Sequence, residues 1–105
     1  MGIEIYWSQL AETKLEDIFY YYRLKAGTKI ARKIIVGIID ATIDLDKNPQ
    51  IGQIEGFLND RPQEFRYLLY TNYKIIYWHN TEKSRIVIAN VFDTRQNPTR
   101  LQQTI

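Results

Sequence analysis

The side chains of this 105-residue sequence that could bind or transform another molecule are mainly cations, and they are unevenly distributed. Residues 1–60 contain seven Lys and Arg against nine Asp and Glu, whereas residues 61–105 contain seven against three. The basic residues of the second part are Arg61, Arg66, Lys74, Lys83, Arg85, Arg95 and Arg100. This excess suits a nucleic acid or an acidic protein as a partner, and a solvated sheet face explains it equally well.

The composition excludes several familiar kinds of catalytic and metal site. The sequence has no cysteine, which removes disulfides, thiolate chemistry and cysteine-bound zinc. It has one histidine, His79, which argues against a histidine-built metal site and against a Ser-His triad. We therefore expect no metal and no cofactor, and we interpret His79 as a structural or exposed residue.

Most of the cations in the second part lie within residues 64–95, which have the pattern of one continuous antiparallel sheet. Segments rich in aromatic, large apolar and β-branched residues predict three strands, at 64–70, 73–79 and 85–92. The polar connections 71–72 and 80–84 are short enough to close hairpins, so the three strands are expected to form a meander.

The middle strand of this meander is predicted to have apolar residues on both faces. Side chains alternate at period two along a strand. One face therefore carries Tyr73, Ile75 and Tyr77, and the other carries Lys74, Ile76 and Trp78. Because neither face is fully polar, we expect both to be partly covered, with Tyr73 and Tyr77 in the core.

The start of the chain predicts a short strand followed by an amphipathic helix. Residues 3–7 alternate, and Ser8 is suited to cap the helix that follows. Apolar residues then recur at three- and four-residue steps from about Gln9 to Leu24, and Gly27 ends this helix.

A second helix is expected from Thr28, which can act as its cap, to about Asp46. Its polar residues form one narrow stripe, so the rest of its surface is apolar and requires burial on more than one side. Residues 49–62 show no clear period and are predicted to form a loop leading into the sheet.

The resulting order is β-α-α-β-β-β, which predicts an α+β fold with a helix pair packed on a twisted antiparallel sheet. No composition shift or linker interrupts the chain, so residues 1–105 are predicted to form a single domain. There is no apolar run of about 18 residues and no signal-peptide pattern at the start. We therefore expect a cytoplasmic protein without a membrane partner.

Several spaced residues, taken together with this order of elements, are similar to a known pattern over nearly the whole chain. They are Ser8, Ala11, Leu15 and Ile18; Leu45, Pro49 and Gly52; Arg66, Leu68, Tyr73, Ile75 and Tyr77; and Ile86, Ile88, Val91 and Arg95. Each group alone is mostly core spacing, and the ordered set is what carries the similarity. The chain resembles the RelE/ParE toxin superfamily.

This resemblance implies the toxin of a type II toxin–antitoxin module, which arrests growth and is neutralised by a cognate antitoxin protein. RelE-like members are ribosome-dependent endoribonucleases that cleave messenger RNA, whereas ParE-like members act against DNA gyrase. The two branches share a fold, so the fold by itself does not choose between them. A homodimer or a toxin–antitoxin complex is a further expectation, because the apolar second helix would otherwise remain uncovered.

The resemblance also implies which residues would act on RNA or contact the target. Arg66, Lys74 and Arg95 fall where RelE-like proteins keep basic residues, and they are the catalytic candidates. Each also has a structural interpretation. Arg66 could pair with an acidic neighbour, Lys74 could lie along the sheet surface, and Arg95 follows a strand end beside Asp93, where a turn could hold it.

The same comparison slightly favours the ParE-like, gyrase-directed branch. Leu68 stands where RelE-like proteins would have a second lysine, and the tail after Asp93 has neither a terminal tyrosine nor a histidine. The acid and base needed for RNA cleavage are therefore incomplete, and whether the chain is an enzyme is left open. The alternatives are a RelE-like endoribonuclease and an inactive antitoxin-binding module on the same fold.

Overall fold

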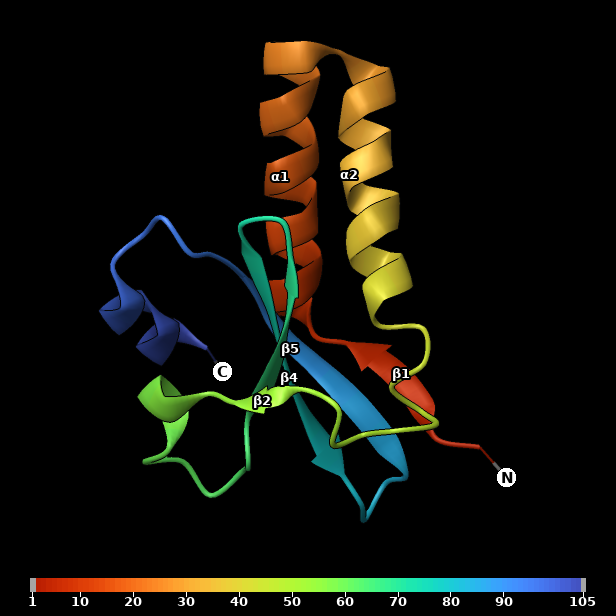
Figure 1. Ribbon diagram of the computed structural model, residues 1–105, viewed down its shortest axis with the longest axis vertical. Helices are drawn as coiled ribbons and strands as arrows, with labels where there is room; N and C mark the ends of the chain where they lie inside the picture. The colour runs from red at the N-terminus through yellow and green to blue at the C-terminus, as the bar shows by residue number, and fades with distance from the viewer. Residues whose placement is uncertain (1, 105) are drawn as a thin grey trace.

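The computed structural model describes residues 2–104 and confirms the predicted α+β order, with additional short elements. The elements are β1 (Glu4–Trp7), α1 (Gln9–Ala26), α2 (Thr28–Ala41), β2 (Gln53–Ile54), η1 (Gly56–Leu58), β3 (Arg66–Tyr70), β4 (Tyr73–Asn80), β5 (Arg85–Asp93) and η2 (Pro98–Gln103), where η denotes a 3-10 helix. Figure 1 shows α1 and α2 side by side as a hairpin whose tip extends beyond the sheet.

The strands form a sheet in the order β1-β5-β4-β3-β2, and this sheet is mixed rather than wholly antiparallel. The predicted meander is present, but β1 runs parallel to β5. Ser8 fixes this arrangement at the end of β1. Its backbone N–H donates to the Ile88 carbonyl at 3.0 Å, and its hydroxyl donates to the Ala89 carbonyl at 3.1 Å. Residue pattern gives a strand no direction relative to a partner far away in the chain, so the parallel pairing was not predictable.

The region predicted to be a loop, residues 49–62, contains β2 and η1. β2 is a two-residue strand that pairs antiparallel with β3. The Tyr77 hydroxyl holds the approach to β2, because it donates to the Pro49 carbonyl at 2.8 Å and accepts from the Gly52 N–H at 2.9 Å. A strand this short carries no periodic signal in the sequence.

The helix boundaries confirm one predicted cap and correct another. Ser8 caps α1, since its side chain accepts a hydrogen bond from the Ala11 N–H. Thr28 does not cap α2; Gly27, at φ 95°, occupies that position without a side-chain bond. This φ suits glycine, which lacks a Cβ atom. α2 ends at Ala41 rather than Asp46, because the backbone bonds that follow tighten to i, i+3 spacing.

Hydrophobic cores lie on both faces of β4, as its apolar alternation predicted. Tyr73, Ile75 and Tyr77 are buried on the side where the helices pack. Ile76 is buried in a second cluster that includes residues of η1 and η2, and Trp78 packs against that cluster. A register shift between Ile76 and Tyr77 does not disturb the alternation.

The helix hairpin leaves apolar side chains exposed, as the narrow polar stripe of the second helix indicated. On α2 and just after it, the exposed residues are Ile30, Val36, Ile39 and Ile43, and Ile43 is 62% exposed. Surface of this kind marks a site for another molecule when it is contiguous. No helix in the described part of the chain is both long and apolar enough to cross a membrane.

Candidate functional site

Lys74, one of the three predicted cations, belongs to a largely buried ion pair. Its Nζ lies 2.8 Å from Oε1 of Glu55 and 4.3 Å from the centre of the Tyr67 ring. The Glu55 side chain is 2% exposed and that of Lys74 is 21% exposed. Glu55 also accepts a hydrogen bond from the Phe57 N–H and so caps η1. These contacts attach the loop containing η1 to the sheet.

Arg66 is held by backbone carbonyls and one carboxylate. Its Nη1 donates to the carbonyls of Gly52 at 2.8 Å and Gln50 at 3.3 Å, and its Nη2 lies 3.1 Å from Glu64. A planar guanidinium with several donors is suited to such a role. Arg66 therefore fastens the segment before β2 to β3.

The sheet register keeps Arg66 and Lys74 apart. Arg66 is opposite Tyr77, whose ring lies in the helix-side core, whereas Lys74 is opposite Phe92, which lies in the second core. Side chains directly opposite in an antiparallel pair share a face, so these two cations belong to opposite faces of the sheet.

Arg95, just beyond β5, is held in a bidentate ion pair. Its Nε lies 3.0 Å from Oδ1 of Asp93 and its Nη2 lies 2.8 Å from Oδ2. Asp93 also accepts hydrogen bonds from the Arg95 backbone N–H and from Asn72. These bonds, above all the one from the Arg95 side chain, lower the pKa of Asp93 to about 2. The same pairing raises the pKa of Arg95, which stays charged.

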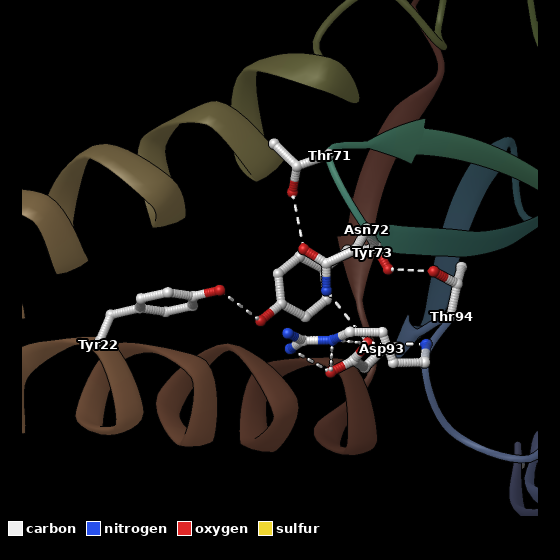
Figure 2. A network of polar contacts seen from close by, with 7 residues as sticks. Tyr22, Thr71, Asn72, Tyr73, Asp93 and Thr94 are labelled. Atoms are coloured by element: carbon white, nitrogen blue, oxygen red, sulfur yellow. Dashed lines mark hydrogen bonds and ion pairs between the residues drawn. The ribbon is translucent and has the colours of Figure 1, made fainter. Parts of the chain in front are cut away.

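Tyr73 lies next to this ion pair and is linked to α1. Figure 2 shows Tyr22 on α1 pointing toward Tyr73, and the Tyr73 hydroxyl donates to the Tyr22 hydroxyl across 3.4 Å. Burial, followed by the hydrogen bond with Tyr22, raises the pKa of Tyr73 above its ordinary value. The phenol therefore remains protonated near neutral pH and can donate a hydrogen bond, but it is a poor general base.

Arg95, Asp93 and Tyr73 line a groove of about 500 Å³ between α1, the end of β5 and η2. The groove also contains Lys14 of α1 and Arg100 of η2, which sequence reasoning had not placed together. Arg100 was noted only as part of the basic excess, and Lys14 lies in the less basic first part of the chain. The sequence gives little indication that these two residues are neighbours, because no residue spacing relates a position on α1 to one on a C-terminal 3-10 helix. We call this the Lys14–Arg95–Arg100 groove.

The three predicted cations thus occupy separate environments. Arg66 is opposite Tyr77 on β4, whereas Arg95 follows Asp93, which is opposite Tyr73. Four residues of strand separate these positions, or roughly 13 Å. Arg66 instead shares a smaller cavity of about 180 Å³ with Glu64, Tyr77 and His79. Within residues 2–104, no group of three or more potential metal ligands is found among His, Cys, Asp and Glu.

The Arg95–Asp93 pair predicts a pH dependence of stability. The pKa of Asp93 in the folded state is about 2, below the ordinary 3.8. Its stabilising effect is therefore fully present above the unfolded pKa and is lost as the pH falls toward the folded pKa. We expect the free energy of unfolding to decline between about pH 4 and about pH 2, and to decline less steeply in Asp93→Asn. Denaturant unfolding of both proteins across this range provides the measurement, and identical pH profiles would contradict the assignment.

The fold is similar to that of the chromosomal ParDE toxin–antitoxin system from P. aeruginosa, with TM-score 0.72, 17% identity, and coverage of 87% of this chain and 95% of that chain. The RelBE2 toxin–antitoxin complex from Mycobacterium tuberculosis matches with TM-score 0.61 and 16% identity over 89% of this chain and 99% of that one. A mutant of the E. coli toxin RelE in the free state matches with TM-score 0.55 and 15% identity over 87% and 82%.

These structural likenesses establish the fold, and the sequence itself identifies the family. No curated protein matched the sequence. The family model described as the ParE toxin of the type II toxin–antitoxin system parDE matches residues 5–98, which run from within β1 to the start of η2 and include both long helices. The match therefore confirms the resemblance to the RelE/ParE superfamily and fits the preference for its ParE-like branch. The chain belongs to the ParE toxin family and is the toxin component of a type II toxin–antitoxin system.

Proposed function

We propose that this toxin arrests growth by acting on DNA gyrase rather than by cleaving messenger RNA, and that a cognate antitoxin neutralises it. The observation that carries the choice of target is the separation of the three candidate cations. Lys74 and Arg66 lie on opposite faces of the sheet. Arg95 follows the end of β5, at the end of the sheet away from Arg66. Such positions do not surround a single phosphate.

Metal-independent RNA cleavage requires a base for the 2′-hydroxyl, cations for the developing charge and an acid for the leaving oxygen, all around one phosphodiester. In this chain all three cations already have partners within the protein. Lys74 pairs with Glu55, and Arg95 pairs with Asp93. Arg66 donates to a backbone carbonyl and pairs with Glu64. The raised pKa of Tyr73 also makes this nearby phenol a poor base. The arrangement supports a surface that contacts a protein target.

The antitoxin is proposed to cover the exposed apolar side chains of α2. Val36 and Ile39, which are 49% and 42% exposed, are three positions apart and are therefore neighbours on the helix surface. Burying them would stabilise a complex by the hydrophobic effect, and in the absence of antitoxin the same surface favours self-association of the toxin. The homodimer expected from the sequence would be of this kind.

A second candidate function is a RelE-like endoribonuclease whose site is the cavity next to Arg66 and His79. His79 and Arg66 line the same cavity of about 180 Å³, together with Tyr77 and Glu64. A histidine beside a guanidinium is a suitable base and cation for phosphodiester cleavage. Arg66 already donates to the Gly52 carbonyl and to Glu64, so its guanidinium is less available to a phosphate, and this weighs against the endoribonuclease.

The proposed target can be tested by inducible expression in a bacterial host, with and without the antitoxin gene expected beside the toxin gene. We expect growth arrest with altered plasmid supercoiling and intact transcripts when the toxin is expressed alone, and no arrest when the antitoxin is present. The measurements are colony counts, topoisomer gels and mapping of transcript ends. A His79→Ala variant should arrest growth like the wild type.

New transcript ends inside translated codons, lost in His79→Ala, would overturn the gyrase assignment and establish the endoribonuclease. Unimpaired growth at a high level of soluble toxin would favour an inactive antitoxin-binding module. Purified gyrase gives an independent readout, since the wild-type toxin should inhibit its supercoiling reaction in vitro.

A further inference from the structure

The Lys14–Arg95–Arg100 groove concentrates cations from three separate elements. Lys14 comes from α1, Arg95 from the turn after β5 and Arg100 from η2. Arg95 is paired with Asp93, whereas no ion pair within residues 2–104 includes Lys14 or Arg100. Two cations of the groove thus remain available to an incoming group.

The charges facing this groove leave an excess of one positive charge. The carboxylates that line it are Asp17 and Asp93, against the three cations. Burial lowers the pKa of Lys14, Asp17 opposes that effect, and repulsion from Arg100 adds to it. Lys14 and Arg100 line the same groove, and their like charges repel each other there. An anionic group placed between them would relieve that repulsion.

We propose that this groove receives an aspartate or glutamate side chain from the protein that the toxin inhibits, with Lys14 and Arg100 as the direct ligands of the carboxylate. This inference rests on the proposed function, because it requires a protein target. Arg95 is the third cation of the groove. Its bidentate pair with Asp93 holds its guanidinium in place, which makes Asp93 a positioning residue.

The lining of the groove favours a protein over a nucleic acid. A nucleic acid binds through several phosphates and prefers a surface of one sign. Here the carboxylates of Asp17 and Asp93 lie among the cations. The net charge of +1 that remains in the groove matches a single carboxylate. The exposed Tyr21 adds an aromatic surface, and Gln96 and Gln103 add amides. Tyrosine and arginine are enriched at protein interfaces.

The position of the groove favours the target over the antitoxin as its occupant. Figure 1 shows the C-terminal segment beside the base of α1, whereas α2 lies on the other side of α1. The apolar surface proposed for the antitoxin is on α2, and the groove is on the side of α1 that carries Lys14 and Asp17. The two surfaces can therefore be altered independently.

The test compares Lys14→Gln/Arg100→Gln with a matched control, Lys29→Gln/Lys83→Gln, which removes two exposed lysines outside the groove. Each toxin is produced with its antitoxin, separated from it and refolded, and its binding to immobilised purified gyrase is measured. Charge-assisted bonds to one carboxylate predict that the groove variant binds about tenfold or more weakly, with the control unchanged. Lys14→Glu/Arg100→Glu should bind more weakly still, because it repels the carboxylate. Antitoxin binding and the thermal midpoint should match the wild type in every variant.

Equal gyrase affinity for the groove variant and the control would overturn the inference while leaving the proposed target intact. A single-stranded RNA oligonucleotide is the second probe. If the wild type binds it and the groove variant does not, the occupant is a nucleic acid and the inference is wrong.

Growth arrest separates the inference from the choice of target. If the wild-type toxin arrests growth without binding gyrase, the proposed target fails. Loss of arrest in the groove variant, with no RNA binding by the wild type, would then support the groove as a contact to a different protein. Arrest that persists in the groove variant would overturn it.

Discussion

The Lys74→Met variant is expected to lose about 3–5 kcal/mol of its free energy of unfolding, because it leaves a buried carboxylate without its cation. The Glu55 side chain is 2% exposed and lies 2.8 Å from the Lys74 Nζ. In the described part of the chain, its other hydrogen bond comes from the Phe57 N–H. Without Lys74 the carboxylate must take up a proton or pull η1 away from the sheet toward water.

Denaturant unfolding measures this loss, and Lys47→Met is the matched control. Lys47 also pairs with a carboxylate, that of Asp44, but the two side chains are 78% and 76% exposed. An exposed pair contributes little, so the control should unfold like the wild type. The double variant Lys74→Met/Glu55→Met should recover much of the lost stability, since replacing both partners of a buried pair is often neutral. A Lys74→Met protein as stable as the wild type would show that the pair has no structural role.

The Gly52→Ala variant is expected to lose about 2–3 kcal/mol of its free energy of unfolding through overpacking. A Cβ atom at this position would lie 2.6 Å from the Tyr77 hydroxyl and 2.7 Å from the Tyr67 carbonyl oxygen. The carbonyl belongs to β3 and cannot rotate away. The segment before β2 would have to shift, which would weaken the Gly52 hydrogen bonds to Tyr77 and Arg66.

Gly56→Ala provides the control for this prediction, because no atom lies within 4 Å of a Cβ added there. It should unfold like the wild type or slightly later, since alanine loses less backbone entropy than glycine on folding. Thermal unfolding of the two variants side by side gives the comparison. Similar midpoints for Gly52→Ala and Gly56→Ala would mean that the contact around Gly52 is easily relaxed.

The first of these variants changes a residue that the sequence associated with function, and the second changes the glycine whose carbonyl binds another such residue, Arg66. Lys74 and Arg66 were candidates for catalysis, and their contacts in the structure bind the segment from Gln50 to Phe57 onto the sheet. A loss of toxicity in Lys74→Met would therefore have to be separated from a loss of folding. The Lys14–Arg95–Arg100 groove is better placed for functional tests, because its cations are on the surface or partly exposed.

Elements whose signal is local and periodic could be predicted from the residues alone. The period-two alternation along β4 predicted that both of its faces are partly covered and that Tyr73 and Tyr77 lie in the core, and the structure confirmed it. Ser8 predicted the start of α1 because a cap depends on residues within one turn. The single narrow polar stripe of the second helix predicted that it requires burial on more than one side, and the structure leaves apolar side chains of α2 exposed, since a helix can bury only part of its circumference within the fold.

Features that depend on residues distant in the chain could not be predicted, because long-range contacts set them. Strand direction is set by hydrogen bonds to a partner, so the alternation of residues 3–7 predicted the strand β1 but not its parallel pairing. The two-residue β2 left no pattern of its own. Sequence reasoning placed Arg66, Lys74 and Arg95 together as candidates, but face and register separate them, because a shift of one residue along a strand reverses the face. The groove instead brings Arg95 together with Lys14 and Arg100. Lys14 and Arg100 meet only after α1 packs beside β5 and the chain turns back at η2, so no sequence spacing could have joined them.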